Sequence, residues 1–235
     1  MVEYNGVTLE SVAPVRIIDI VLSPPAVTVT AQSHALTDGA RFVRCKRGER
    51  TVTITFALLT EDYAARRAQL AAITAWASSS ALAPLSIITE PGGYLQAICT
   101  AYPAQSGRQF WEVLTLTFTA YDPRFIGCVE YTLPVLRPVI VAHNEPPLMR
   151  IEQDITTSIS SPSWALEDSK LQLSGAVGVG RLVIDFERQT ITLNGQSIMN
   201  QFTIDSRFFV LKQGANTVIC TGGAGGTLYW RERWI

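Results

Sequence analysis

The sequence predicts a mainly β protein with two domains: an N-terminal β-sandwich-like domain with one helix, then a small C-terminal β-sandwich. Two long segments alternate strictly between apolar residues and threonine, which is typical of half-buried strands. One segment has the periodicity of an amphipathic helix. After about residue 150, short β-branched runs alternate with Gly and Asn turns, which is typical of a small sandwich. We expect domains at residues 1–133 and 134–235.

The composition fits a protein with a sizeable core and excludes several functional classes. Apolar residues make up 47% of the chain and charged residues 17%, so the chain is not disordered. A net charge of −1 argues against a general binder of nucleic acid or membrane surfaces. We expect no signal peptide and no membrane helix, because no apolar stretch is long enough. Four scattered cysteines favour free thiols over a zinc site or a disulfide framework.

The two alternating strands are expected at Thr51–Leu58 and Val113–Ala120. In the first strand, Val52, Ile54 and Phe56 point one way and the threonines between them point the other way. The second strand repeats this arrangement. The threonine faces carry no charge, so they suit cross-strand pairing or a surface covered by a neighbour.

The helix is expected from about Glu61 to Trp76, between those strands. Thr60 is the expected N-cap, and acidic residues follow it where the helix dipole favours them. Leu70 and Ile73 lie on the apolar stripe, which should pack on a sheet. Arg66 interrupts the stripe and must snorkel or find a partner.

Four prolines interrupt the next stretch, at Pro134, Pro138, Pro146 and Pro147. Proline cannot donate a hydrogen bond to a sheet, so this density predicts an inter-domain connection with at most an edge strand.

A hairpin is expected early in the C-terminal domain. Leu182–Phe186 and Thr190–Leu193 are short β-branched runs separated by three residues, and Asn194-Gly195 then suits a tight turn with positive φ. The further strands expected in this domain are Leu171–Leu173, Phe208–Leu211, Thr217–Cys220 and Tyr229–Trp234.

Residues that could carry catalysis are few. A triad of Ser33, His34 and Asp38 would have poor geometry, because neighbouring side chains on an extended segment point to opposite faces. The glycine run at 222–226 lacks the Lys-Ser/Thr and the helix of a phosphate loop. Carboxylates such as Asp185, Glu187 and Asp205 read as solvated strand ends. We therefore expect no enzyme, no catalytic residue, no cofactor and no metal.

One basic segment, RFVRCKRGER at residues 41–50, is a candidate interface. It follows Asp38-Gly39 and leads into a threonine-faced strand, so a projecting hairpin is expected. It is either a solvated arm, or an arm that binds an acidic partner or a neighbouring copy of this chain. Its cations are Arg41, Arg44, Lys46, Arg47 and Arg50.

The C-terminal sequence WRERWI contains two tryptophans, Trp230 and Trp234, on one face of the expected strand. Paired tryptophans can stack on sugar rings, but they more often cover a sandwich core, and we favour the core. Sugar stacking would make the C-terminal domain a carbohydrate-binding module for adhesion to the host surface. A carbohydrate-binding module is therefore the alternative to a purely structural function.

The first 125 residues of the chain contain, in this order, the segments LESV, DGARF, KRGERTVTITFALLTED, AAITAWA and YDPRF. Together they resemble the N-terminal domain of the distal tail proteins of long-tailed, non-contractile (siphovirus-type) bacteriophages and prophages. LVIDFERQTITLNGQ, DSRFFVLKQGANTV and WRERW are similar to the C-terminal domain of that family. The resemblance covers nearly the whole chain.

The resemblance implies a split-barrel N-terminal domain and a galectin-like C-terminal β-sandwich. It also implies a structural virion protein that forms a ring, typically a hexamer, at the distal end of the tail tube. The ring would join the tube protein to the tail-associated baseplate hub and could hold a receptor-binding protein. DNA would pass only transiently through its lumen, and no membrane is involved. The expected location is the virion tail tip, assembled in the host cytoplasm.

Overall fold

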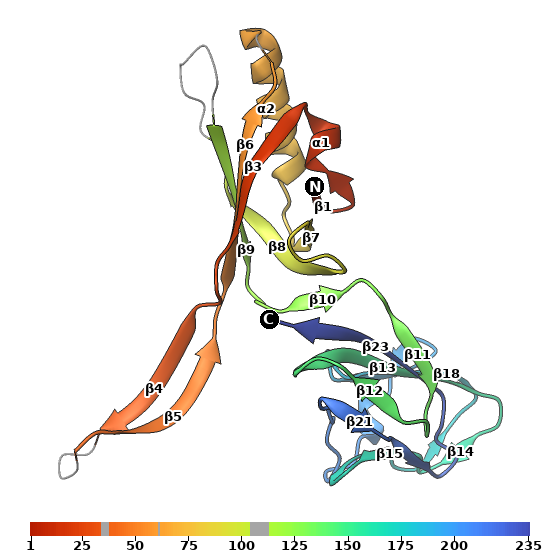
Figure 1. Cartoon of the computed structure of the whole chain (residues 1–235). Coiled ribbons are helices and arrows are strands. Elements are labelled where there is room, and N and C mark those ends of the chain that lie inside the picture. Colours follow the sequence, from red (N-terminus) through yellow and green to blue (C-terminus); the bar gives the residue numbers. More distant parts are fainter. Residues whose placement is uncertain (34–37, 61, 104–112) are drawn as a thin grey trace. The chain divides into compact units, whose positions relative to one another are not determined.

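The computed structural model describes residues 1–33, 38–60, 62–103 and 113–235, which divide into two compact units, Met1–Phe125 and Ile126–Ile235. Both units are built mainly from antiparallel strands (Figure 1). The predicted mainly β fold class is therefore confirmed. In the described ranges, no helix is long and apolar enough to cross a membrane.

The first unit contains an antiparallel sheet in the order β2-β1-β7-β8-β9-β6-β3. Its elements are β1 (Val2–Tyr4), β2 (Val7–Thr8), α1 (Leu9–Val12), β3 (Val15–Leu22), β6 (Arg50–Leu58), α2 (Tyr63–Ala77), β7 (Ala83–Ile87), β8 (Gly93–Ala101) and β9 (Val113–Ala120). The predicted alternation is confirmed, because Val52, Ile54 and Phe56 are fully buried. On the other face, Thr53 lies opposite Thr117 in the register of β6 and β9.

Helix α2 covers the core side of this sheet with Leu70, Ile73 and Ala77, which are buried. The predicted N-cap at Thr60 is wrong. Asp62 is the cap, because its carboxylate accepts the backbone N–H groups of residues 64 and 65 at 3.2 and 3.1 Å. Glu61 lies outside the described residues. Arg66, which the pattern placed on the apolar stripe, is indeed buried.

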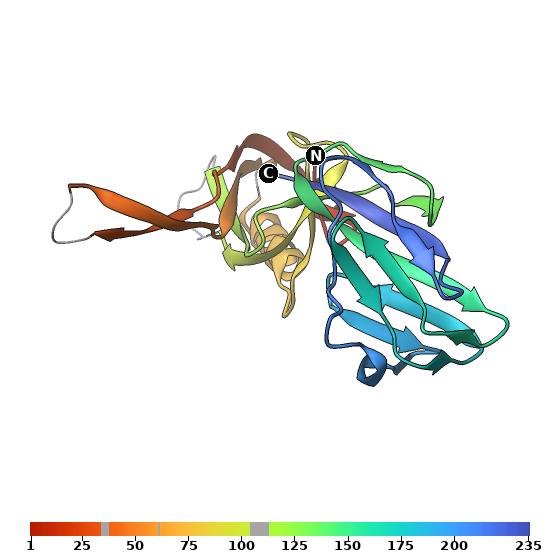
Figure 2. The same cartoon turned by 90° about the horizontal axis from the view of Figure 1, so that it is seen from below.

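Between β3 and β6 the chain leaves the sheet and forms two further strands, β4 (Val27–Ser33) and β5 (Ala40–Arg47). They pair only with each other, in antiparallel register from Val27 opposite Arg47 to Ser33 opposite Ala40. Figures 1 and 2 show this ribbon extending away from the sheet and helices of the first unit. We call β4 and β5 together the arm. The predicted projecting hairpin is confirmed in these strands.

The second unit is a β-sandwich. One layer has the strand order β11-β23-β13-β18-β19-β20, and the other is built on β16-β15-β22 with the small pairs β12–β21 and β14–β17. Between the layers lie fully buried side chains such as Trp164, Ile151 and Leu182. The elements are β10 (Phe125–Gly127), which begins at the unit boundary, β11 (Tyr131–Pro134), β12 (Val139–Val141), β13 (Glu145–Ile155), β14 (Ile159–Ser160), β15 (Ser163–Leu166), β16 (Ser169–Gln172), β17 (Ala176–Val177), β18 (Gly180–Asp185), β19 (Thr190–Leu193), β20 (Gln196–Ser197), η1 (Met199–Gln201), β21 (Gly214–Asn216), β22 (Ile219–Thr221) and β23 (Thr227–Trp234).

The proline-rich stretch is not a connection, contrary to its sequence pattern. It contains β12 and the start of β13, and β13 lies between β18 and β23. Strand β13 tolerates Pro146 and Pro147 because the register shifts between Glu145 and Leu148, so the ladder is interrupted where the N–H groups are missing. Residues 126–133, expected in the first domain, lie in the second unit.

The expected hairpin of the second unit is confirmed as β18 and β19, and Asn194 and Gly195 adopt positive φ in the following turn. The strand expected at Phe208–Leu211 is wrong. Phe208 and Phe209 pack on the Phe186 ring, with centroids 5.7 and 4.8 Å away. Their apolar pattern therefore reflects packing in the core and not pairing with a neighbouring strand.

Candidate functional site

The structure separates the five predicted interface cations into two groups. Arg41, Arg44, Lys46 and Arg47 lie on β5 of the arm, where every residue is exposed. Arg50 instead begins β6 and pairs with Ala120 inside the main sheet of the first unit.

Arg50 is only 5% exposed, and its guanidinium lies over the Phe125 ring, 5.5 Å from the centroid. Burial lowers the pKa of Arg50 from its ordinary value, and the charge of Glu90 opposes that shift. Its Nε and Nη1 atoms are buried without a hydrogen-bond partner in the part of the chain that the structure describes. Arg50 therefore does not contribute to the surface of the arm.

The register of the arm gives it two chemically different faces. Side chains directly opposite each other in antiparallel strands share a face. Thr28 lies opposite Lys46, Thr30 opposite Arg44, and Gln32 opposite Arg41, so these residues make a polar face with three cations. The basic face consists of Thr28, Thr30, Gln32, Arg41, Arg44 and Lys46.

The opposite face of the arm is largely apolar. Val29 lies opposite Cys45, and Ala31 lies opposite Phe42, beside the register shift that leaves Val43 unpaired. Val29 is 59% exposed and Phe42 is 62% exposed. The apolar face consists of Val27, Val29, Ala31, Phe42 and Cys45, with Arg47 at its edge.

The two faces explain what the sequence pattern could and could not show. The cations of β5 are visible as a basic run in the sequence, but three of the five residues of the apolar face come from β4. The alternation of VTVTAQS at residues 27–33 is the signal that could have found it. Neither strand of the arm contains an acidic residue.

The two C-terminal tryptophans do not form a sugar platform together. Trp230 is 5% exposed and stacks on Tyr131 at 5.3 Å, so it belongs to the core, as favoured from the sequence. Trp234 stacks on His143, with ring centroids 5.0 Å apart. The carbohydrate-binding alternative therefore loses Trp230 as an exposed platform.

The other polar candidates do not assemble into a catalytic group. His34 lies outside the described residues. Asp185 accepts the backbone N–H groups of Glu187 and Arg188 at 3.0 and 2.9 Å, so its carboxylate holds the β18–β19 turn. Asp205 is exposed, in a turn of the second unit.

A chain of ion pairs crosses the outer face of the sandwich in the second unit. Arg150 on β13 contacts Glu130 and Glu152, each at 2.7 Å. Glu152 also binds Arg181 on β18, and Glu130 binds Arg231 on β23 at 3.4 Å. The hydrogen bond from Arg150 is the main cause that lowers the pKa of Glu130, and burial opposes it.

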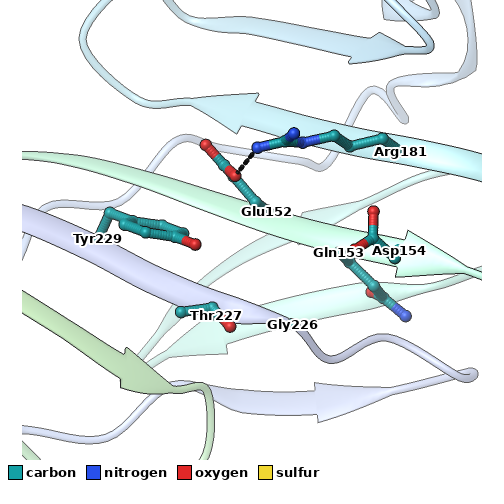
Figure 3. Close-up of a pocket in the computed structure, with 7 residues that line it drawn as sticks. All are labelled: Glu152, Gln153, Asp154, Arg181, Gly226, Thr227 and Tyr229. Carbon is teal, nitrogen blue, oxygen red and sulfur yellow. Dashed lines mark hydrogen bonds and ion pairs between the residues drawn. The ribbon is translucent and has the colours of Figure 1, made fainter.

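At the Arg181 end of this chain lies a polar pocket of about 390 Å³ (Figure 3). It is lined from three strands, β13, β18 and β23, by Glu152, Gln153, Asp154, Arg181, Gly226, Thr227 and Tyr229. Sequence reasoning missed it, because its residues are far apart in the chain and carry no motif.

The comparisons with known proteins agree with this architecture. Residues 144–234 match the family model described as "Siphovirus-type tail component, C-terminal domain". The crystal structure of Dit from phage SPP1 matches with 19% identity and a TM-score of 0.85, over 100% of this chain and 98% of that one. That protein is described as a paradigm of hub adsorption apparatus in Gram-positive infecting phages.

Two structures of the phage P2 baseplate in its activated conformation are also similar. The calcium form matches with 8% identity and a TM-score of 0.51, over 94% of this chain and 91% of that one. The strontium form gives 9% identity and the same TM-score. At these identities the likeness shows the fold alone. A comparison with curated protein sequences found no match.

The family match covers all of β13 to β23, which includes the pocket and every member of the ion-pair chain except Glu130. Residues 144–234 are therefore similar to the C-terminal domain of siphovirus-type tail components, and the resemblance of the sequence to the distal tail proteins is confirmed.

Proposed function

We propose that this chain is a structural hub protein that forms a ring, typically of six copies, at the distal end of the phage tail tube. The first unit would make the ring, and the ring would join the tube protein to the tail-associated hub. The full-length fold shared with SPP1 Dit, which is described as a hub of an adsorption apparatus, supports this role.

The observation that carries the proposal is the uncovered apolar face of the arm. A two-stranded ribbon alone is marginally stable in water. Large apolar side chains exposed on it indicate a surface that another protein covers. In the monomer, Val27, Val29 and Phe42 are each about 60% exposed. A neighbouring subunit that covered them would remove this apolar area from water.

The location of this face also favours a closed ring. The arm is a single projecting element, and it would bind a different patch on the next copy. Such a heterologous contact closes into a ring when the rotation is suitable. The basic face would then stay available for an acidic surface on a second partner, such as the tube protein.

The apolar face is tested by the double substitution Val29→Ser and Phe42→Ser. Light scattering after size-exclusion chromatography should show rings for the unmodified chain and smaller species for the variant. The monomer should stay folded, because neither side chain contributes to a core. The matched control is Val179→Ser, which changes a valine 60% exposed on the second unit and should leave rings intact. Rings that persist in the double variant would contradict the proposal.

The basic face is tested separately, by reversing Arg41 and Arg44 to Glu. Both lie on this face, whereas Arg44 and Arg47 lie on opposite faces. Exposed ion pairs are each worth about 0–1 kcal/mol, so a double reversal is needed to add up several repulsive contacts. Rings should still form, and docking to purified tail tubes at physiological salt should weaken. Unchanged docking would show that the basic face is only solvated.

A further inference from the structure

The pocket on the second unit has the features of a binding site for a neutral sugar ring. Gly226, with φ of +104°, lines the pocket with backbone alone. A Cβ atom at this position would come within 2.3 Å of the Glu152 backbone oxygen. Gly226 therefore lets β23 approach β13 closely, and the polar side chains around Gly226 form the rest of the pocket lining.

One wall of the pocket is held rigidly. The Glu152 carboxylate is bound on one side by Arg150 and on the other by Arg181. The Arg150 guanidinium also lies over the Tyr229 ring, 4.4 Å from its centroid. Arg181 is thus oriented by Glu152, and Tyr229 is oriented by Arg150, before any ligand arrives. Such pre-orientation lowers the entropic cost of binding.

Other polar groups in the pocket are unused. The Asp154 carboxylate and the hydroxyls of Thr227 and Tyr229 make no side-chain hydrogen bond within the described ranges of the chain. The Gln153 amide is occupied, because it bonds Gly223 and Gly225 at 3.0 and 2.9 Å and fixes the loop before β23. Figure 3 shows the unused groups together with Arg181 around the pocket.

The unused groups define the chemistry of the ligand. They combine a carboxylate acceptor, further donors on Arg181, and two hydroxyls that can donate and accept. The charges of Glu152 and Asp154 are balanced by those of Arg150 and Arg181, so the site has no net charge and favours a neutral ligand over an ion. A sugar ring presents neighbouring hydroxyls that each donate and accept. A vicinal pair could bond Asp154 and Arg181 together, while Thr227 and Tyr229 bond the rest.

We propose that this pocket binds a neutral hexopyranose unit of a surface glycan. The site is distinct from the tryptophan pair considered from the sequence, and it does not depend on ring formation. It would give the chain a weak adhesive contact beyond its structural role. Repetition of the site in an oligomer would strengthen such a contact through avidity.

The test is saturation-transfer NMR on the full chain with glucose, galactose, N-acetylglucosamine and N-acetylgalactosamine, each added alone. We expect transfer to the ring protons of at least one sugar, with a millimolar dissociation constant. The variant Asp154→Asn keeps the shape of the side chain but removes its charge, and it should weaken binding by about tenfold, as expected for the loss of a charged hydrogen bond. The control Asp205→Asn changes an exposed carboxylate elsewhere on the second unit and should bind as the unmodified chain does.

Three results would overturn the proposal. The first is no transfer to any of the four sugars. The second is that Asp154→Asn and Asp205→Asn bind the sugar equally well. The third is transfer to N-acetyl-lysine amide and to none of the sugars. The last result would show a cation site. Light scattering on the same samples separates this test from the proposed ring, because Asp154→Asn should assemble normally.

Discussion

The arm and the β18–β19 hairpin are both antiparallel ribbons, and they differ in what covers them. Each contains a strand rich in β-branched residues, β4 in the arm and β19 in the hairpin. In β18–β19, Leu182, Ile184 and Ile191 are fully buried under the second layer of the sandwich. In the arm, Val29 and Phe42 are about 60% exposed. Local pattern therefore forms the ribbon, and only the presence of a covering layer decides whether it is core or interface.

The largest expected effect comes from a substitution in the layer that covers β18 and β19 in the second unit. Trp164 is fully buried, and its Nε1 donates to the Gly225 carbonyl at 3.0 Å. Trp164→Ala should lower the free energy of unfolding of this unit by about 3–5 kcal/mol, because it leaves a large cavity and an unpaired carbonyl. Chemical denaturation followed by circular dichroism measures this. A loss below about 1 kcal/mol would show that the sandwich is not the core of this unit.

A matched pair of valines tests the same contrast inside the first unit. Val52 on β6 is fully buried, and Val29 on the arm is 59% exposed. Val52→Ala should cost about 2 kcal/mol of monomer stability, whereas Val29→Ala should change it by less than about 0.5 kcal/mol. Denaturation below the concentration at which rings form gives both values. Equal costs would mean that the arm is already covered in the monomer.

Buried and exposed cations give a third, smaller contrast. Arg50 is buried, and two of its nitrogens have no hydrogen-bond partner among the described residues, whereas Arg44 is exposed on the arm. Arg50→Met should raise monomer stability by about 1 kcal/mol, because an incompletely paired buried charge costs more than a hydrophobic side chain of similar length. Arg44→Met should leave it unchanged. Thermal unfolding measures both, and a clear loss on Arg50→Met would show that its stacking on Phe125 dominates.

Period-two alternation predicted the strands of the first unit and the β18–β19 hairpin well, because each has one face on a core. The density of prolines was misleading at β13, because a register shift accommodates Pro146 and Pro147 in this strand. The apolar pattern failed at Phe208–Leu211, because buried aromatic residues in a coil give the same apolar signal as a strand.

The candidate interface was predicted only in part. Charge on β5 is a local property, so four of the five cations were placed correctly on a projecting ribbon. Arg50 was wrongly assigned to the ribbon. The ribbon ends before residues 48 and 49, and the run of charges continues past that point. The apolar face and the polar pocket need strand pairing over long sequence distances. Glu152 and Thr227 in the pocket, for example, meet only through the register of β13 and β23.

The smallest expected effect concerns the outer face of the sandwich, where ion pairs between side chains take the place of apolar burial. The folded-state pKa of Glu130 is lowered mainly by its hydrogen bond from Arg150. Its contribution to stability is therefore present above its ordinary pKa of 4.5 and is lost as the pH falls through the lower folded value. The side chain is 27% exposed, so solvent screening limits the contribution to less than about 1 kcal/mol. Glu130→Gln should reduce stability slightly at pH 7 and flatten the loss below pH 4.5, while Asp205→Asn, at an exposed carboxylate, should follow the unmodified chain. Parallel stability profiles for Glu130→Gln and the unmodified chain between pH 3 and pH 7 would show that the ion-pair chain adds nothing to the fold, and that only the covered face of this sheet stabilises it.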